Sequence, residues 1–259
     1  MIRARVLAGH LGPIAVSVLL VAAAAAQPKS TYRAPRTPDG KPDLQGIWEA
    51  RNTANGNLEA HSASMGIRAG ESVIVDPADG KIPYQPAARD QQKQNFAARA
   101  SADPVNKCFL PGVPRVNYMP YPFEIFQTPE FVAITYEYEH ASRTIHMNGS
   151  PHLDGIEFWM GDSRGHWDGE TLVVDVADNN GDTWLDSSGN HHSNAMHVVE
   201  RYTRTGPDSL LYEATVEDPK TLTRPFKISM PLYRHTEKNA QLYEYECHVY
   251  REEGRAGSK

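Results

Sequence analysis

Ionisable side chains are concentrated in one stretch of the sequence, between Trp159 and Arg204. The same stretch contains apolar runs such as Leu172-Val173-Val174, which are typical of β-strands. Its charged or titratable residues are Asp162, Arg164, His166, Asp168, Asp175, Asp186, His191, His192, His197, Glu200 and Arg201. Side chains that alternate along neighbouring strands meet on one face of a sheet. We therefore expect any chemistry to be located here, in one cavity of a barrel or sandwich.

The spacing of three of these residues indicates acid–base chemistry. Asp162, Arg164 and His166 are two positions apart, so they would share one face of a strand. A carboxylate, a guanidinium and an imidazole in a row are able to orient one another for proton transfer. A ladder of surface salt bridges has the same pattern, and both interpretations stay open.

A loop that enters the strand near residue 197 supplies further candidates. We expect His192 or His197 to act as a general base, with a carboxylate as its partner and an arginine to stabilise a developing anion. The candidate catalytic residues are His192, His197, His166, Asp162 and Glu200, and the candidate substrate-binding residues are Arg164, Arg201, Trp159 and Tyr202. A metal site made from His192, His197 and a carboxylate is an alternative. No compact motif such as His-x-His or His-Glu-x-x-His supports it, so we expect no metal.

The alternation of side chains predicts two strand faces but does not say which one is inside. In Met196–Arg204, one face carries His197, Val199, Arg201 and Thr203, and the other carries Met196, Val198, Glu200 and Tyr202. Residues 211–217 and 241–250 likewise have one face with charged residues and one face rich in Tyr and Val. In one interpretation the charged faces are solvated and the Val/Tyr faces form the core, with Glu200 as the one charged residue on the core face. In the other, the charged faces line a polar lumen and the aromatic faces form the outside of the barrel. A buried charge needs a partner, and Arg201 with Glu217 is a plausible pair.

Short apolar runs separated by turn residues predict many strands. Turns are indicated at Asn148-Gly149, Asp168-Gly169 and Asn180-Gly181. The expected strands are 43–50, 71–76, 123–127, 130–139, 142–148, 156–160, 163–168, 170–177, 195–204, 209–217, 226–235 and 241–250. Short connections favour antiparallel hairpins. The sequence thus predicts an all-β fold, an antiparallel meander that forms a lipocalin-like barrel or a strongly bent sandwich.

One helix and one irregular loop accompany the strands. Residues 86–102 are rich in helix formers, begin with proline and contain few apolar positions, which predicts a surface helix. Residues 103–122 contain several prolines together with Tyr, Phe and Val, which is typical of an ordered loop. We expect a single β domain at 43–253, preceded by an extended lead-in at 27–42.

The N-terminus and the two cysteines indicate export. Residues 1–26 have basic residues followed by an apolar run that ends in alanines, as in a secretory signal peptide. We expect a periplasmic or secreted protein with no stable membrane span after signal removal. In that setting Cys108 and Cys247, the two cysteines of the chain, are expected to form a disulfide. Two separate thiols, one of them a nucleophile, are the alternative.

Composition and missing motifs narrow the classes of function. The net charge is −6 and no basic stripe is present, which argues against nucleic acid as a partner. The chain has no Gly-rich phosphate loop, no Gly-x-Ser-x-Gly elbow and no Cys-His motif, so ATP-, nicotinamide- and serine-hydrolase-type activities are disfavoured. We expect no organic cofactor and a small molecule as substrate or ligand.

Three sequence motifs resemble segments of known proteins. They are Pro120-Tyr-Pro-Phe-Glu-Ile-Phe-Gln-Thr-Pro, Met160-Gly-Asp-Ser-Arg-Gly-His-Trp-Asp-Gly-Glu-Thr-Leu-Val-Val-Asp and His197-Val-Val-Glu-Arg-Tyr-Thr-Arg. Together they resemble an uncharacterised family of exported bacterial proteins over roughly residues 36–250, which implies export but no chemistry. Gly46-Ile-Trp48 is similar to the Gly-x-Trp of lipocalins and implies a related barrel, although the long segment 50–122 departs from the lipocalin pattern.

These observations lead to one functional hypothesis and two alternatives. The hypothesis is an exported enzyme that uses acid–base side chains in a barrel cavity, as a lyase, isomerase or hydrolase acting on a small, partly apolar molecule. The alternatives are a non-catalytic carrier of lipocalin type and a metal-dependent hydrolase.

Overall fold

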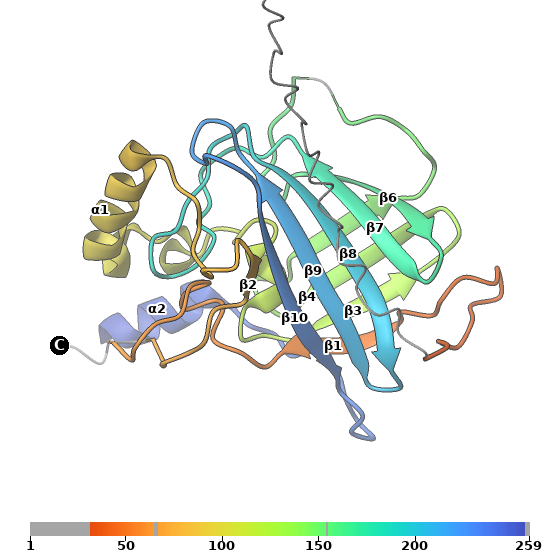
Figure 1. Cartoon of the computed structure of the whole chain (residues 1–259). Coiled ribbons are helices and arrows are strands. Elements are labelled where there is room, and N and C mark those ends of the chain that lie inside the picture. Colours follow the sequence, from red (N-terminus) through yellow and green to blue (C-terminus); the bar gives the residue numbers. More distant parts are fainter. Residues whose placement is uncertain (1–31, 65–66, 154, 257–259) are drawn as a thin grey trace, which may run out of the picture. The chain divides into compact units, whose positions relative to one another are not determined.

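The described part of the chain is built around a closed β-barrel (Figure 1). The computed structural model describes residues 32–64, 67–153 and 155–256, so the predicted signal segment 1–26 lies outside the described residues. The barrel strands are β1 (Gly46–Ala50), β3 (Phe123–Gln127), β4 (Phe131–Tyr136), β5 (Ser142–His146), β6 (Asp162–Asp168), β7 (Thr171–Ala177), β8 (His197–Gly206), β9 (Ser209–Glu217) and β10 (Phe226–Arg234). A short strand β2 (Ile74–Asp76) adds to β10. The predicted all-β barrel is confirmed.

The strands follow one another around the barrel in chain order, and β1 closes it by pairing with both β3 and β10. A ring of nine strands cannot close with antiparallel pairs alone, because their direction must return to itself after one circuit. The parallel pair is β5–β6, where Ile145 lies opposite Ser163. The expectation of a purely antiparallel meander is therefore wrong at this one pair. The intervening residues 147–161, here called the crossover segment, must carry the chain from one end of the barrel to the other.

The valine and tyrosine faces of the long strands point into the barrel. In β8, Val198, Glu200 and Tyr202 are fully buried, while the alternate residues are partly exposed. In β9, Tyr212 and Ala214 are likewise fully buried. The interpretation that the Val/Tyr faces form the core is therefore confirmed for these two strands, with Glu200 and Arg204 of β8 as charged exceptions on the buried face.

The Pro-rich loop closes one end of the barrel. Its 3-10 helix η2 (Arg115–Tyr118) is buried, and the amide of Asn117 donates to Glu200 and to the hydroxyl of Tyr212 at 2.7 and 3.1 Å. A second 3-10 helix, η1 (Pro104–Lys107), precedes it. The predicted surface helix is α1 (Pro86–Ala102), which begins with its proline and buries only Ala88.

Two expected strands are not strands. Residues 156–160 belong to the crossover segment, where Phe158 makes an isolated bridge to Asn179. Residues 241–250 contain one bridge, between Tyr245 and Tyr138, and then enter helix α2 (Cys247–Ala256). The alternation of apolar and polar residues in 241–250 is short, and such a pattern does not separate a strand from a helix end.

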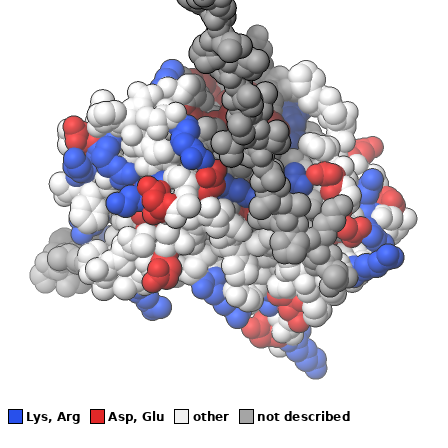
Figure 2. Space-filling model, in the orientation of Figure 1, with Lys and Arg blue, Asp and Glu red and all other residues white. Residues whose placement is uncertain are grey.

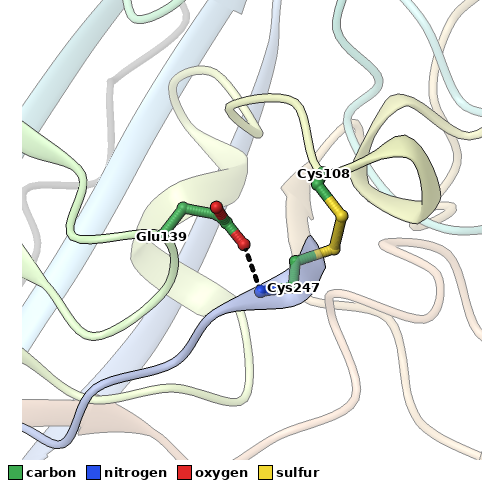
Figure 3. Close-up of side chains that lie close together, drawn as sticks. All are labelled: Cys108, Glu139 and Cys247. Carbon is green, nitrogen blue, oxygen red and sulfur yellow. Dashed lines mark hydrogen bonds between the residues drawn. A yellow bond between two sulfur atoms is a disulfide. The ribbon is translucent and has the colours of Figure 1, made fainter. Parts of the chain in front are cut away.

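The disulfide Cys108–Cys247 is formed, which confirms the predicted pairing over the alternative of two separate thiols. Figure 3 shows how it ties the start of α2 to the loop after η1. Among the described residues, no helix has the length and apolar character that a bilayer span requires. Basic and acidic side chains are interspersed on the face shown in Figure 2.

Candidate acid–base site

The crossover segment places a histidine on the outer face of the barrel, over two carboxylates. Nδ1 of His152 lies 2.9 Å from Oδ2 of Asp162, the first residue of β6. Nε2 of the same ring lies 2.7 Å from Oδ1 of Asp175 in β7. Asp175 faces Arg164 across the β6–β7 pair, so all four side chains belong to one outer surface.

His152 is held as an imidazolium by this arrangement. A carboxylate only accepts hydrogen bonds, so both ring nitrogens must donate and both must carry a proton. Burial lowers the pKa of His152, but the hydrogen bonds to Asp175 and Asp162 outweigh burial and raise the pKa above its usual value. His152 therefore anchors the crossover segment electrostatically.

His197, at the start of β8, shares Asp175 with His152. Its Nε2 lies 3.0 Å from both carboxylate oxygens of Asp175. Because the carboxylate accepts, Nε2 carries the hydrogen, and Nδ1 of a neutral His197 holds the basic lone pair. A histidine whose far nitrogen is fixed by a carboxylate is the arrangement that general-base sites use.

Asp162 and Arg164 complete the cluster. The guanidinium donates to both oxygens of Asp162, at 2.8 Å from Nε and 3.0 Å from Nη2, and also to the hydroxyl of Ser150. Burial raises the pKa of Asp162, but Arg164 and His152 lower it below its usual value. We call His152, Asp162, Arg164, Asp175 and His197 the histidine–carboxylate cluster.

The two sides of this cluster differ in access to solvent. The side chains of His197 and Asp175 are 37% and 41% exposed, whereas Asp162 is buried at 8%. Leu153 and Ile156, which follow His152 in the crossover segment, expose large apolar side chains. The open side of the cluster is therefore the His197–Asp175 pair.

Three of the predicted site residues, Asp162, Arg164 and His197, are thus brought together, but outside the barrel and not in its cavity. Their strand faces are the outer faces, because the alternate residues pack inside. His166 shares the outer face of β6 and is exposed. It does not belong to the cluster, since it follows Arg164 by one further step along the strand.

His192 lies elsewhere, buried in the loop before β8. Its Nδ1 donates to the carbonyl of Ser193 at 2.9 Å, so its Nε2 accepts from the hydroxyl of Thr183 at 2.7 Å. Burial lowers its pKa below the usual value, which keeps the ring neutral. Both nitrogens are used, so His192 is placed as a structural residue of this loop.

Glu200 and Tyr202 point into the barrel. Oε2 of Glu200 accepts a hydrogen bond from the guanidinium of Arg143, and Oε1 accepts from Tyr212 at 2.7 Å and from Tyr202 at 3.1 Å. Arg143 also donates to Ser163 at 2.8 Å. The buried glutamate is therefore neutralised by a buried arginine, as a charge inside a core requires.

The remaining candidates lie away from the cluster. Arg201 donates to Asp168 at 2.8 Å, in place of the expected pair with Glu217, because β8 and β9 pair with Arg201 opposite Glu213. Trp159 is half-buried and its ring packs against Phe109, with ring centroids 5.1 Å apart.

The sequence interpretation gave no role to His152 or Asp175. His152 stands in the turn-rich run Asn148-Gly-Ser-Pro-His, which carries no strand pattern. Asp175 does carry a signal, because it interrupts an otherwise apolar strand. A carboxylate at such a position needs a partner, and here it has two histidines.

Three side chains offer one potential metal ligand each within 4.8 Å of one another, namely His152, Asp162 and Asp178. Asp162 already receives two hydrogen bonds from Arg164 and one from His152. A metal ion would have to displace these bonds and would lie beside a guanidinium. The donor set therefore fits an ion-pair cluster better than a metal centre.

Comparison with known proteins gives the site no precedent. No family model, no curated protein and no solved structure matches this chain. Its chemistry must therefore be argued from its own geometry.

Proposed function

We propose that this protein is an exported enzyme in which His197 acts as a general base, oriented by Asp175, on a small and partly apolar molecule. The observation that carries the proposal is the pair of 3.0 Å contacts between Nε2 of His197 and the two oxygens of Asp175, at a side chain that remains accessible. The contacts fix the tautomer, so Nδ1 is the atom that receives the proton.

The other members of the cluster support this role. Asp175 stabilises the imidazolium that forms when His197 takes up a proton. His152 donates to Oδ1 of Asp175, which His197 also contacts, and keeps that carboxylate oriented, while Arg164 holds Asp162, the other hydrogen-bond partner of His152. His152, Asp162 and Arg164 are positioning residues in this proposal.

The reaction class follows from what a base at this position does. Lyases and isomerases begin with removal of a proton from carbon, and hydrolases of this type begin with removal of a proton from water. The exposed apolar side chains of Leu153 and Ile156, on the segment that carries His152, are the surface that the proposal assigns to a partly apolar molecule.

The proposal is tested by a screen of proton-transfer reactions with the full chain in its oxidised form. Deuterium uptake from D2O into small oxo acids, hydroxy acids and ketones is followed by mass spectrometry, and hydrolysis of 4-nitrophenyl acetate is followed by absorbance. Wild type is compared with His197→Ala and with His166→Ala, a neighbouring exposed histidine outside the cluster. We expect an activity that His197→Ala lowers and His166→Ala retains. Absence of activity across the whole screen, or equal loss in both variants, contradicts the proposal.

Carriage of a ligand in the lumen is less well supported. The lumen-facing side chains of β8 and β9 are buried, and Glu200 among them is bonded to Arg143, Tyr202 and Tyr212. These contacts make the lumen a packed core.

Export is part of the proposal. The sequence pattern of residues 1–26 and the resemblance to exported proteins support it, and the disulfide fits a compartment outside the reducing cytoplasm. Fractionation of expressing bacterial cells by osmotic shock tests it: the expected result is release with the periplasmic fraction, and retention with the cytoplasm contradicts it.

A further inference from the structure

A cavity of about 320 Å³ lies at the end of the barrel that η2 closes. It is bordered by Tyr121, just before β3, and by Tyr138, just after β4, which meet at the same end because these strands are antiparallel. Its volume lies in the range of pockets that bind small molecules. It is lined by none of the residues of the histidine–carboxylate cluster.

One wall of the cavity is aromatic. The ring of Tyr121 lies 4.5 Å from that of Tyr245 and 5.5 Å from that of Tyr138, and the rings of Tyr138 and Tyr245 are stacked at 5.6 Å. Tyr138 is 2% exposed, so the ring surface on which a flat ring can stack belongs to Tyr121 and Tyr245, which are partly exposed.

The polar part of the lining contains two guanidinium groups. Arg115 is 1% exposed and donates to both oxygens of Asp103 at 2.8 Å, to Asn55 at 3.0 Å and to Ser187 at 2.8 Å. Its orientation is therefore fixed before any ligand arrives. Arg251 of α2 supplies a second guanidinium, and the lining contains no aspartate or glutamate.

The wall that carries Tyr245 and Arg251 is held in place by three contacts at the start of α2. They are the disulfide Cys108–Cys247, the hydrogen bond from the backbone N–H of Cys247 to Oε1 of Glu139 at 2.6 Å, and the hydrogen bond between Nε2 of His140 and Oε1 of Glu246 at 2.8 Å. Figure 3 shows the first two of these contacts converging on Cys247. The cavity is thus a preorganised pocket whose outer wall depends on the disulfide.

We propose that this cavity is a binding site for a small aromatic carboxylate. The tyrosine wall stacks against the ring, and Arg251 attracts the carboxylate, while Arg115 is a fixed part of the lining through its pair with Asp103. A cationic ligand is disfavoured, because Arg251 lines the cavity and no carboxylate does, while the charge of Arg115 is balanced by Asp103. This site is independent of the proposed function, since it shares no residue with the histidine–carboxylate cluster.

The proposal is tested by calorimetric titration of the oxidised full chain with 4-hydroxybenzoate and 1-naphthoate. The neutral 4-hydroxybenzyl alcohol serves as a matched probe without the charge. Arg251→Gln is compared with Arg68→Gln, an exposed arginine outside the cavity. We expect saturable binding of one carboxylate probe per chain, about tenfold weaker or more for Arg251→Gln and for the alcohol, and unchanged for Arg68→Gln.

Two further variants sharpen the test. Replacement of both Cys108 and Cys247 by serine is expected to weaken binding while circular dichroism of the barrel is retained, because only the outer wall is released. His197→Ala is expected to bind the carboxylates with the affinity of wild type. The test of the carboxylate-binding site is therefore independent of the test of His197 as a general base. Absence of saturable binding by both carboxylates, or equal affinity for the neutral alcohol, overturns the proposal.

Discussion

Nε2 of His197 contacts both carboxylate oxygens of Asp175 at 3.0 Å, from adjacent strands of the barrel wall. The two residues are diagonal neighbours on the outer face, because Asp175 pairs with Val199 and His197 stands two positions before it. The geometry is thus fixed by strand register and not by a mobile loop. A base held on rigid elements keeps its orientation, which is a condition for efficient proton transfer.

The pH dependence of stability tests the role of His152. Its pKa is raised in the folded state, so its contribution is complete below the unfolded value of about 6.5 and is lost as the pH rises through the folded value. We therefore expect His152→Ala to reduce the free energy of unfolding more at pH 6 than at pH 9, measured by urea denaturation.

The variant His192→Gln should show the opposite pH dependence of stability. The pKa of His192 is lowered by burial, so its contribution is present above about pH 6.5 and is lost as the pH falls. The difference between this variant and wild type should shrink toward acid pH. If the His152→Ala difference does not change with pH, His152 is not held as an imidazolium.

The buried pair Glu200–Arg143 predicts strong coupling in stability. Replacing Glu200 by alanine leaves the guanidinium of Arg143 buried without its counter-charge, which lowers the free energy of unfolding by about 3–5 kcal/mol. The double variant Glu200→Leu/Arg143→Met removes both charges and should be less destabilised than the sum of its single variants. Urea unfolding followed by circular dichroism measures all of these values. Additive effects would show that the two side chains do not interact.

The disulfide predicts a sensitivity to reduction. It joins residues 139 positions apart, so its loss increases the conformational freedom of the unfolded chain and lowers the free energy of unfolding by about 5 kcal/mol in the loop-entropy account. The check is urea unfolding of Cys108→Ser/Cys247→Ser beside oxidised wild type. A difference below about 1 kcal/mol would mean that α2 is held mainly by its non-covalent contacts.

Chelation tests the interpretation of the histidine–carboxylate cluster as metal-free. Arg164 already binds Asp162 through two donors, so we expect dialysis against EDTA to leave activity and stability unchanged. The contrary result is that purified protein contains stoichiometric Zn²⁺ or Mn²⁺ and that Asp178→Asn loses both the metal and the activity. That result would show that the cluster is a metal centre.

The barrel was predictable from the sequence because β8 alternates between buried and more exposed positions, β9 does so apart from the buried Glu213, and their Val/Tyr faces are suited to a core. The parallel pair β5–β6 was not predictable, because it depends on closure of the whole ring. The helix α2 was missed because its position is set by Cys108 and Glu139, more than a hundred residues earlier in the chain.

The site was predictable to the extent that it depends on strand faces. Asp162, Arg164 and His197 stand at outer positions of β6 and β8, and alternation alone places them on the strands. The sequence did not show whether these side chains meet inside or outside the barrel. They lie outside because the alternate residues of the same strands pack into the core. His152 reaches the cluster through the crossover segment, and a turn-rich segment carries no periodic signal that places its side chains.

The central claim is that His197 itself takes up the proton, and its most direct test is turnover on the substrate that the exchange screen identifies. We predict that kcat/KM of His197→Ala is lower than that of His166→Ala by about a hundredfold or more. His166→Ala is the matched control, because His166 is an exposed histidine outside the cluster. Equal kcat/KM values for the two variants would contradict the account.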